Sequence, residues 1–194
     1  PTRAAKADTL TAMARRWRRP LAIVLAAAIC LPAGIAAAQF GRRGFGGFRA
    51  QYASAKDFDG RFHFFRIVYQ SALDGDGGNW NADWPRADIN LSVRLSELTK
   101  TDVSKDATGE PNHLLIRFTD PELFDCPFVM ATEVGRTLIG DQDAKALRLY
   151  LEKGGFLWVD DFWGSYAWDH WVAQIRKALP ANEFPIFDVP LDHP

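Results

Sequence analysis

The chain has 194 residues, of which 47% are hydrophobic and 24% charged. This composition is typical of a globular protein and excludes an intrinsically disordered one, and its 7 Trp and 14 Phe residues predict an aromatic-rich core. Residues 1–38 contain six of the 23 Lys and Arg residues but one of the 24 Asp and Glu residues, so the remainder carries a net charge of −6. That acidity argues against nonspecific nucleic-acid binding.

The N-terminal region has the three parts of a secretory signal. A basic stretch follows Met13, an apolar run covers 21–36, and small residues lead to Ala38. The run has about 16 residues, fewer than the roughly 20 that usually cross a bilayer. We therefore expect a signal region over 1–38, a true start at Met13, cleavage after Ala38, and export to the periplasm or cell envelope. The alternative is that 21–36 is retained as a membrane anchor.

Residues 39–60 are rich in Gly, Arg and Phe and show neither helical nor strand periodicity, which is typical of a flexible linker. The folded domain is expected over 61–194. Cys126 is the one cysteine that follows the signal, so this domain is expected to be stabilised by its core and not by an internal disulfide.

The domain sequence alternates between short apolar strands and amphipathic helices. Strands are expected at 62–69, 114–118, 128–132, 156–159 and 186–189. Helices are expected at 85–98, 141–153 and 166–179, with N-caps at Asp83, Asp141 and Ser165. This alternation predicts right-handed βαβ units and the α/β fold class, with a mainly parallel sheet between helices.

Acidic residues follow nearly every predicted strand. In an open parallel sheet, ligands bind beyond the carboxyl ends of the strands, so these side chains are expected to lie at one edge. The candidate catalytic residues are Glu133, Asp160 and Asp161, which could perform acid–base chemistry or hold a divalent cation. The candidate ligand-binding residues are Asp76, Gly77, Gly78, Asn79, Trp80, Asp120, Trp163 and His193. The alternative for each Asp is a cap of the following loop or helix.

Several catalytic signatures are absent from the sequence. The segment around Ser165 lacks the second glycine of a Gly-x-Ser-x-Gly elbow, and the glycine-rich segment 75–80 lacks the Lys of a phosphate-binding loop. The four histidines, His63, His113, His170 and His193, do not have metal-ligand spacing. Structural roles are expected for His63 and His170.

Four segments together resemble a known family. They are GGNW at 77–80, RFTDPELF at 117–124, LRLYLEKGGFLWVDDFWG at 147–164, and the Asp-His-Pro sequence at 192–194. The chain resembles the domain of unknown function 4159 family. This resemblance implies a class I glutamine amidotransferase-like fold, which is a flavodoxin-like three-layer sandwich, and a domain that is incomplete here at its C-terminal side. It also implies envelope protein partners.

In amidotransferases of this fold a Cys nucleophile follows a central strand. The corresponding stretch here, 130–135, has none. We therefore expect an exported, non-catalytic domain that binds a ligand or protein in the cell envelope through an acidic, Trp-containing strand-end edge. The alternatives are a divalent-cation-dependent hydrolase that uses the same carboxylates, and a structural subunit whose surface Trp residues bind another protein. Exposure of Trp80 and Trp163 is the feature that favours a binding surface.

Overall fold

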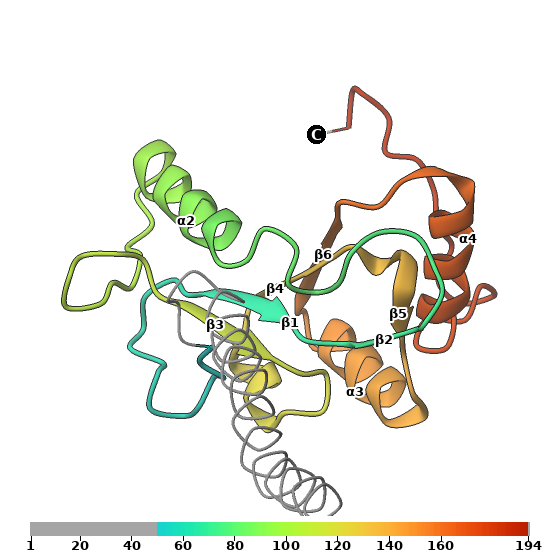
Figure 1. Ribbon diagram of the computed structural model, residues 1–194, viewed down its shortest axis with the longest axis horizontal. Helices are drawn as coiled ribbons and strands as arrows, with labels where there is room; N and C mark the ends of the chain where they lie inside the picture. Colours follow the sequence, from blue (N-terminus) through green and yellow to red (C-terminus); the bar gives the residue numbers. More distant parts are fainter. Residues whose placement is uncertain (1–49, 194) are drawn as a thin grey trace, which may run out of the picture. The chain divides into compact units, whose positions relative to one another are not determined.

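The computed structural model describes residues 50–193. Its main sheet has four parallel strands in the order β3-β1-β4-β6 (Figure 1). They are β1 (Phe64–Ile67), β3 (His113–Ile116), β4 (Phe128–Thr132) and β6 (Phe156–Asp160). Two short strands, β2 (Gln70–Ser71) and β5 (Thr137–Leu138), pair antiparallel beside it. The α/β class and the parallel sheet predicted from the sequence are confirmed.

Helices lie on both faces of this sheet. They are α2 (Arg86–Leu98), α3 (Asp141–Glu152) and α4 (Gly164–Ile175), and two short 3₁₀ turns, η1 (Pro121–Asp125) and η2 (Val134–Arg136), flank β4. Figure 1 shows α2 above the sheet and α3 below it. Because side chains alternate along a strand, Phe65 and Ile67 join Leu147 of α3 and Trp171 of α4 in the main core.

The opposite face is only partly covered by α2. Phe156 and Trp158 of the edge strand β6 are 60% and 37% exposed on this face. An apolar groove of about 420 Å³ lies between α2 and this half of the sheet; its lining includes Leu91, Leu95, Phe128 and Trp158. A helix is about 10 Å wide and adjacent strands are about 4.8 Å apart, so one helix covers about two strands of the four.

Several element ends differ from the sequence prediction. The N-cap positions are Pro85, Gly140 and Trp163, and none of them caps its helix with a side chain. The predicted caps Asp83, Asp141 and Ser165 were therefore wrong by one or two residues, which is the ordinary uncertainty of helix ends. The strand predicted at 62–69 is divided into β1 and β2, because the chain leaves the main sheet after Ile67.

The strand predicted at 186–189 was wrong. The structure has no regular element there, and Ile186, Phe187 and Val189 are exposed. Glu183 and Phe184, shortly before this segment, contact Arg148 of α3. A strand needs a partner, and nothing is paired with this segment in the structure.

The compact unit begins at Ala50 rather than near Arg61. Tyr52 pairs in parallel with Leu115 of β3, and Phe58 stacks on Phe65 with ring centroids 5.6 Å apart. The described part of the predicted linker, 50–60, therefore packs on the domain. The predicted signal region 1–38, the start at Met13 and the rest of the linker lie outside the described residues. Within residues 50–193, no helix is long and apolar enough to cross a membrane.

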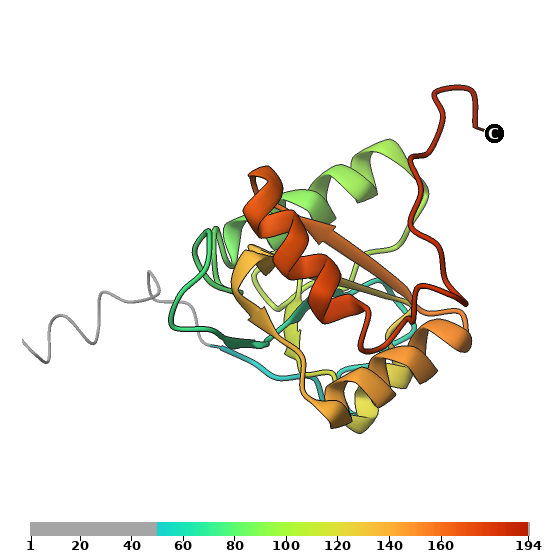
Figure 2. The ribbon, with the colours of Figure 1, turned by 90° about the vertical axis from the view of Figure 1, so that its right-hand side faces the viewer.

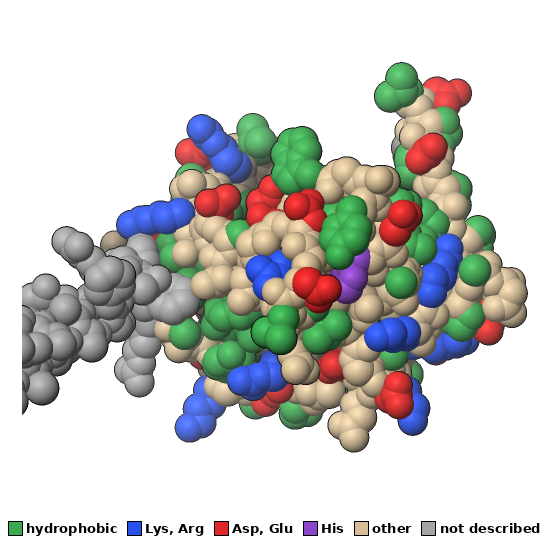
Figure 3. Space-filling model, turned by 45° about the vertical axis from the view of Figure 1, so that its right-hand side comes forward, with side chains coloured by type: hydrophobic (Ala, Val, Ile, Leu, Met, Phe, Trp, Pro, Cys, Tyr) green, Lys and Arg blue, Asp and Glu red, His purple; other side chains and the backbone are tan. Residues whose placement is uncertain are grey.

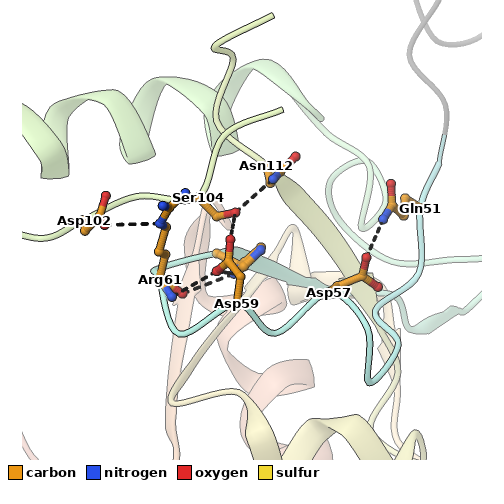
Figure 4. Close-up of polar contacts among 8 residues, drawn as sticks. Gln51, Asp57, Asp59, Arg61, Asp102, Ser104 and Asn112 are labelled. Atoms are coloured by element: carbon orange, nitrogen blue, oxygen red, sulfur yellow. Dashed lines mark hydrogen bonds and ion pairs between the residues drawn. The ribbon is translucent and has the colours of Figure 1, made fainter. Parts of the chain in front are cut away.

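A polar cluster joins this N-terminal segment to the residues that precede β3 (Figure 4). Asp59 accepts hydrogen bonds from the Ser104 hydroxyl at 2.7 Å and from the Arg61 backbone amide at 3.0 Å. The Ser104 hydrogen bond lowers the pKa of the Asp59 carboxyl. Asn112 donates to Ser104, and Arg61 lies 3.2 Å from Asp102. The cluster lies at the amino end of the sheet, opposite the predicted site.

Candidate functional site

The carboxyl ends of β4 and β6 lie side by side and bring three predicted carboxylates together. Thr132 of β4 is in register with Asp160 of β6, and the Glu133 backbone amide donates to the Asp160 carbonyl at 3.1 Å. Asp161 follows directly, and its backbone amide donates to the Asp160 carboxylate at 2.8 Å. Glu133, Asp160 and Asp161 thus share one edge, as the sequence predicted.

Two of these residues adopt a backbone conformation that side chains rarely take. Glu133 has φ 55° and Asp161 has φ 58°, and Asp83 at the start of α2 has φ 55°. They are the non-glycine residues with positive φ in the described part of the chain. Such residues cost free energy and persist where the surrounding structure fixes them, which is common at functional sites.

The Tyr69 hydroxyl holds the turn after β4. Its oxygen lies 2.7 Å from the carbonyl oxygens of both Thr132 and Glu133. Burial raises the pKa of Tyr69, so the hydroxyl keeps its proton and remains a donor at neutral pH. One hydrogen bond donor thus stabilises the residue with the strained backbone and the residue before it.

A glycine-rich loop, Gly75 to Gly78, packs closely on this turn. A Cβ on Gly75 would lie 2.8 Å from the Gly135 carbonyl, and one on Gly77 would collide with the Glu133 carboxylate. One on Gly135 would lie 2.7 Å from the Asp76 carbonyl. Gly75 and Gly135 are therefore required where two backbone segments approach closely, and Gly77 is required where the loop covers the Glu133 carboxylate.

The same loop is tied down at its base by the pairing of β2 with β5 and by Arg136. The Arg136 guanidinium donates to the carbonyls of Ala72 and Leu73 at 2.8 and 3.0 Å. Its Nε atom and Oε2 of Glu133 are buried and have no hydrogen-bond partner in the structure. Buried polar atoms without a hydrogen-bond partner are uncommon in native proteins. The turn after β4 therefore contains buried polar groups that its packing does not require.

The far end of the loop is anchored by a buried ion pair. Arg66 in the middle of β1 contacts the Asp88 carboxylate of α2 through Nε at 2.9 and 3.1 Å and also through Nη2. Arg66 Nη1 donates to the carbonyls of Trp80 and Ala82 at 3.2 and 3.3 Å. Both side chains are fully buried. Burial raises the pKa of the Asp88 carboxyl, and the hydrogen bond from Arg66 opposes that shift.

The exposed part of the site is the corner where β6 passes into α4. We call Asp160, Asp161, Trp163 and Tyr166 the β6–α4 corner. Trp163 is 75% exposed and Tyr166 is 63% exposed. Figure 3 shows acidic side chains interspersed with large hydrophobic ones on the face that it presents. The corner therefore combines negative charge with accessible aromatic rings.

Other predicted residues have structural roles. Asn79 accepts hydrogen bonds from the Ser71 hydroxyl at 2.6 Å and from the Trp80 amide at 2.8 Å, which closes the loop. Trp80 packs against the core and lies edge-on to Trp84, so it does not form a surface. Gly77 and Gly78 line the contact with Glu133, and the Asp76 carbonyl packs against Gly135.

Two predicted residues are not brought to the corner. Asp120 follows β3, which is the outer strand on the other side of the sheet, roughly 14 Å away from β6 at the usual strand spacing. Its carboxylate accepts a hydrogen bond from the Arg117 amide at 2.8 Å and so caps a turn. His193 lies in the exposed C-terminal tail because no strand forms at 186–189.

The remaining Cys and His side chains lie in structural surroundings. Cys126 is buried, and burial raises the pKa of its thiol to about 12, so it is not a nucleophile at neutral pH. His170 Nε2 lies 2.7 Å from the Thr137 carbonyl, and His63 is buried beside Asp59, as expected of structural histidines. Among residues 50–193, no three His, Cys, Asp or Glu side chains are placed to hold a metal ion.

Arg66, Asp88, Tyr69 and Arg136 were missed in the sequence. The signal that could have identified Arg66 is a charged residue within the otherwise apolar strand Phe64–Ile67. A buried Arg requires a carboxylate partner, but the choice of Asp88 among many acidic residues depends on how α2 packs.

The family model of a domain of unknown function, DUF4159, matches residues 63–194, from just before β1 to the end of the chain. The chain belongs to this family. The match includes both the glycine-rich loop and the β6–α4 corner of this DUF4159 domain. No curated protein matches the chain.

The contact between loop and turn is testable at Gly135. In Gly135→Ala the new Cβ would lie 2.7 Å from the Asp76 carbonyl and 2.8 Å from Ala167 Cβ. We expect overpacking to lower the free energy of unfolding by about 1–3 kcal/mol, measured by urea denaturation. Gly78→Ala is the control, because its nearest neighbour would be 3.6 Å away. Equal stability of the two variants would contradict the proposed packing.

The buried ion pair is testable at Asp88. Asp88→Asn keeps the shape but leaves the Arg66 guanidinium buried without a counter-charge, and we expect a loss of about 3–5 kcal/mol in unfolding free energy. Glu97→Gln is the matched control, since its pair with Arg94 is exposed and should change stability by less than about 0.5 kcal/mol. Similar losses in the two variants would show that Asp88 does not carry this role.

Proposed function

We propose that this domain is a non-catalytic binding module that recognises a cationic partner through the β6–α4 corner. The observation that carries the proposal is the 75% exposure of Trp163, which follows the two carboxylates Asp160 and Asp161 after one intervening residue, Phe162. An exposed Trp close to an exposed Tyr is a candidate for a binding surface, because Trp and Tyr dominate binding energy at protein interfaces.

The chemistry of the corner favours a positively charged group. Aromatic faces attract Lys and Arg side chains, and adjacent carboxylates add charge-assisted hydrogen bonds. Trp168 stacks on Phe162, with centroids 6.2 Å apart and ring planes at 11°, which gives the start of α4 a rigid aromatic support. A rigid surface loses little conformational entropy when it binds.

The corner is testable with an oligo-arginine peptide. We expect Trp163→Ala, and separately Asp160→Asn with Asp161→Asn, to weaken binding about tenfold in fluorescence anisotropy at low salt, because each removes a central contact. The controls are Leu98→Ala, whose side chain is also exposed, and Asp102→Asn, an exposed carboxylate at the other end of the sheet. If Trp163→Ala bound as tightly as Leu98→Ala, the corner would not be the binding surface.

The cation-dependent hydrolase is an expectation from the sequence that no structural observation favours. Its three carboxylates do share an edge, but the Glu133 side chain packs under the glycine-rich loop. A divalent cation as cofactor therefore stays an untested prediction, and the binding role is the one the exposed residues support.

We further propose that the protein acts in the periplasm or cell envelope, with envelope proteins as its partners. The support is the signal pattern from Met13 to Ala38 and the acidity of the remainder. Expression of the gene in a bacterial host should yield an exported protein whose intact mass corresponds to a start at Gln39. A mass that includes 21–36, in the membrane fraction, would favour the retained anchor instead.

We also propose that the fold is the flavodoxin-like sandwich of class I glutamine amidotransferases. The support is the strand order β3-β1-β4-β6 with helices on both faces and the half-covered α2 face. The corresponding stretch here, residues 130–135, contains no Cys, so the Cys chemistry of those enzymes is not proposed for this domain. An experimental structure with a different order of the four parallel strands would count against this proposal.

A further inference from the structure

A cavity of about 570 Å³ lies at the amino end of the sheet. Its walls come from the segment before β1, which includes Ala55 and Phe58, from the start of β1, and from Asp125 and Pro127 before β4. Figure 1 shows β1 starting at the end away from α4, and Figure 2, seen from the opposite end, has α4 in the foreground. The cavity is therefore separate from the β6–α4 corner, and its volume lies within the roughly 300–1,000 Å³ of small-molecule sites.

Aromatic rings form the apolar part of the cavity. Phe58 stacks on Phe65, with ring centroids 5.6 Å apart and ring planes at 17°, and the His63 ring lies 6.0 Å from the Phe65 ring. Phe65 is buried in the main core, so the core holds this stack in place. Rings that are fixed in this way offer a flat apolar wall, against which another aromatic ring can pack.

His63 contributes a polar group to the same wall. The residue is 5% exposed and lines the cavity. Its Nδ1 atom lies 3.2 Å from the Arg61 carbonyl oxygen, which can only accept a hydrogen bond, and 3.8 Å from the Asp59 carboxylate. Nδ1 therefore carries the proton, and Nε2 of the neutral ring is a hydrogen-bond acceptor. No group among residues 50–193 donates to Nε2.

A nearly buried acceptor of this kind favours a ligand that brings a donor. Buried polar groups in proteins are nearly always hydrogen-bonded, and a buried acceptor without a donor costs free energy. A compound with an N–H group and a flat ring would supply the donor to His63 and pack its ring on Phe58 and Phe65 at the same time.

The charges around the cavity disfavour an anionic compound. Asp125 lines the cavity, and the Asp59 carboxylate stands beside His63. The positive charge of Arg61 is balanced by Asp102, whose carboxylate lies 3.2 Å from Arg61 Nε (Figure 4). A carboxylate or phosphate group would therefore meet an excess of negative charge here.

We propose that this cavity binds a small, flat aromatic compound that has an N–H donor and no negative charge, of about the size of an indole. Its N–H group donates to Nε2 of His63, and its ring packs against Phe58 and Phe65. The wall from Ala55 to Phe62 precedes residue 63, where the family match begins, so this wall lies outside the part of the chain that the family model describes. The proposal does not depend on binding at the β6–α4 corner.

The site is testable with indole by saturation-transfer NMR on the full chain. We expect saturable binding with a Kd below about 1 mM, which is within reach of a compound of this size. N-methylindole has the same ring but no N–H group. It should bind about three- to tenfold more weakly, because it makes one hydrogen bond fewer. Absence of saturable indole binding, or equal affinity for the two compounds, would overturn the proposal.

Two variants place the compound in the cavity. His63→Phe keeps a flat ring but removes Nε2, so we expect it to bind indole and N-methylindole equally. Ala55→Leu adds a larger side chain to an exposed part of the wall, and should weaken both compounds about fivefold because less room remains for a ring. Lys56→Leu is the control, since Lys56 is exposed beside Ala55 but does not line the cavity.

The exposed position of Ala55 keeps the test valid if His63→Phe fails to fold, because Ala55 lies outside the core. Unchanged indole binding in Ala55→Leu would overturn the proposal. So would a His63→Phe variant that still prefers indole to N-methylindole.

The apolar groove beside α2 is another place where an aromatic compound could bind. Leu98 lines that groove and is 82% exposed, so Leu98→Ala separates the two locations. We expect Leu98→Ala to bind indole as tightly as the wild type does. A loss of affinity as large as that in Ala55→Leu would place the compound in the groove and overturn the cavity site. The oligo-arginine experiment uses a different ligand and different variants of the corner, so the two proposals can fail separately.

Discussion

The buried ion pair between Arg66 and Asp88 is the constraint on which the functional edge depends. A guanidinium in the middle of the central strand β1 cannot be left without partners, because an unpaired buried charge costs several kcal/mol. Asp88 satisfies it and fixes α2, while the carbonyls of Trp80 and Ala82 fix the end of the long loop after β2. A charge in the core thus determines the path of a surface loop.

That loop also stabilises the backbone conformation of the turn after β4. Arg136 holds the base of the loop, and the glycines in its middle pack against Glu133 and Gly135. The Tyr69 hydroxyl donates a hydrogen bond to the Glu133 carbonyl. Glu133, a non-glycine residue with positive φ, is stable there because these contacts fix its backbone conformation. Asp161 has a similar positive φ within the β6–α4 corner, where the exposed aromatic rings lie.

Much of the candidate site was predictable because it follows from strand polarity. Glu133, Asp160, Asp161 and Trp163 were placed at one edge since the carboxyl ends of parallel strands meet there. Strand order was not predictable, and so Asp120, which follows an outer strand, was grouped with residues across the sheet. The same residue type caps turns and binds ligands, so Asp120 and Asn79 could not be told apart from site residues by pattern alone.

The sequence by itself determined the α/β class, the parallel sheet and the position of most helices, because hydrophobic periodicity reports which face of each element is buried. It also determined the family. Only the tertiary structure decided that Arg66 pairs with Asp88, that Trp80 is packed against the core while Trp163 is exposed, and that the strand predicted at 186–189 lies unpaired. These depend on contacts between residues far apart in the chain, and local pattern carries no information about which distant partner, if any, is present.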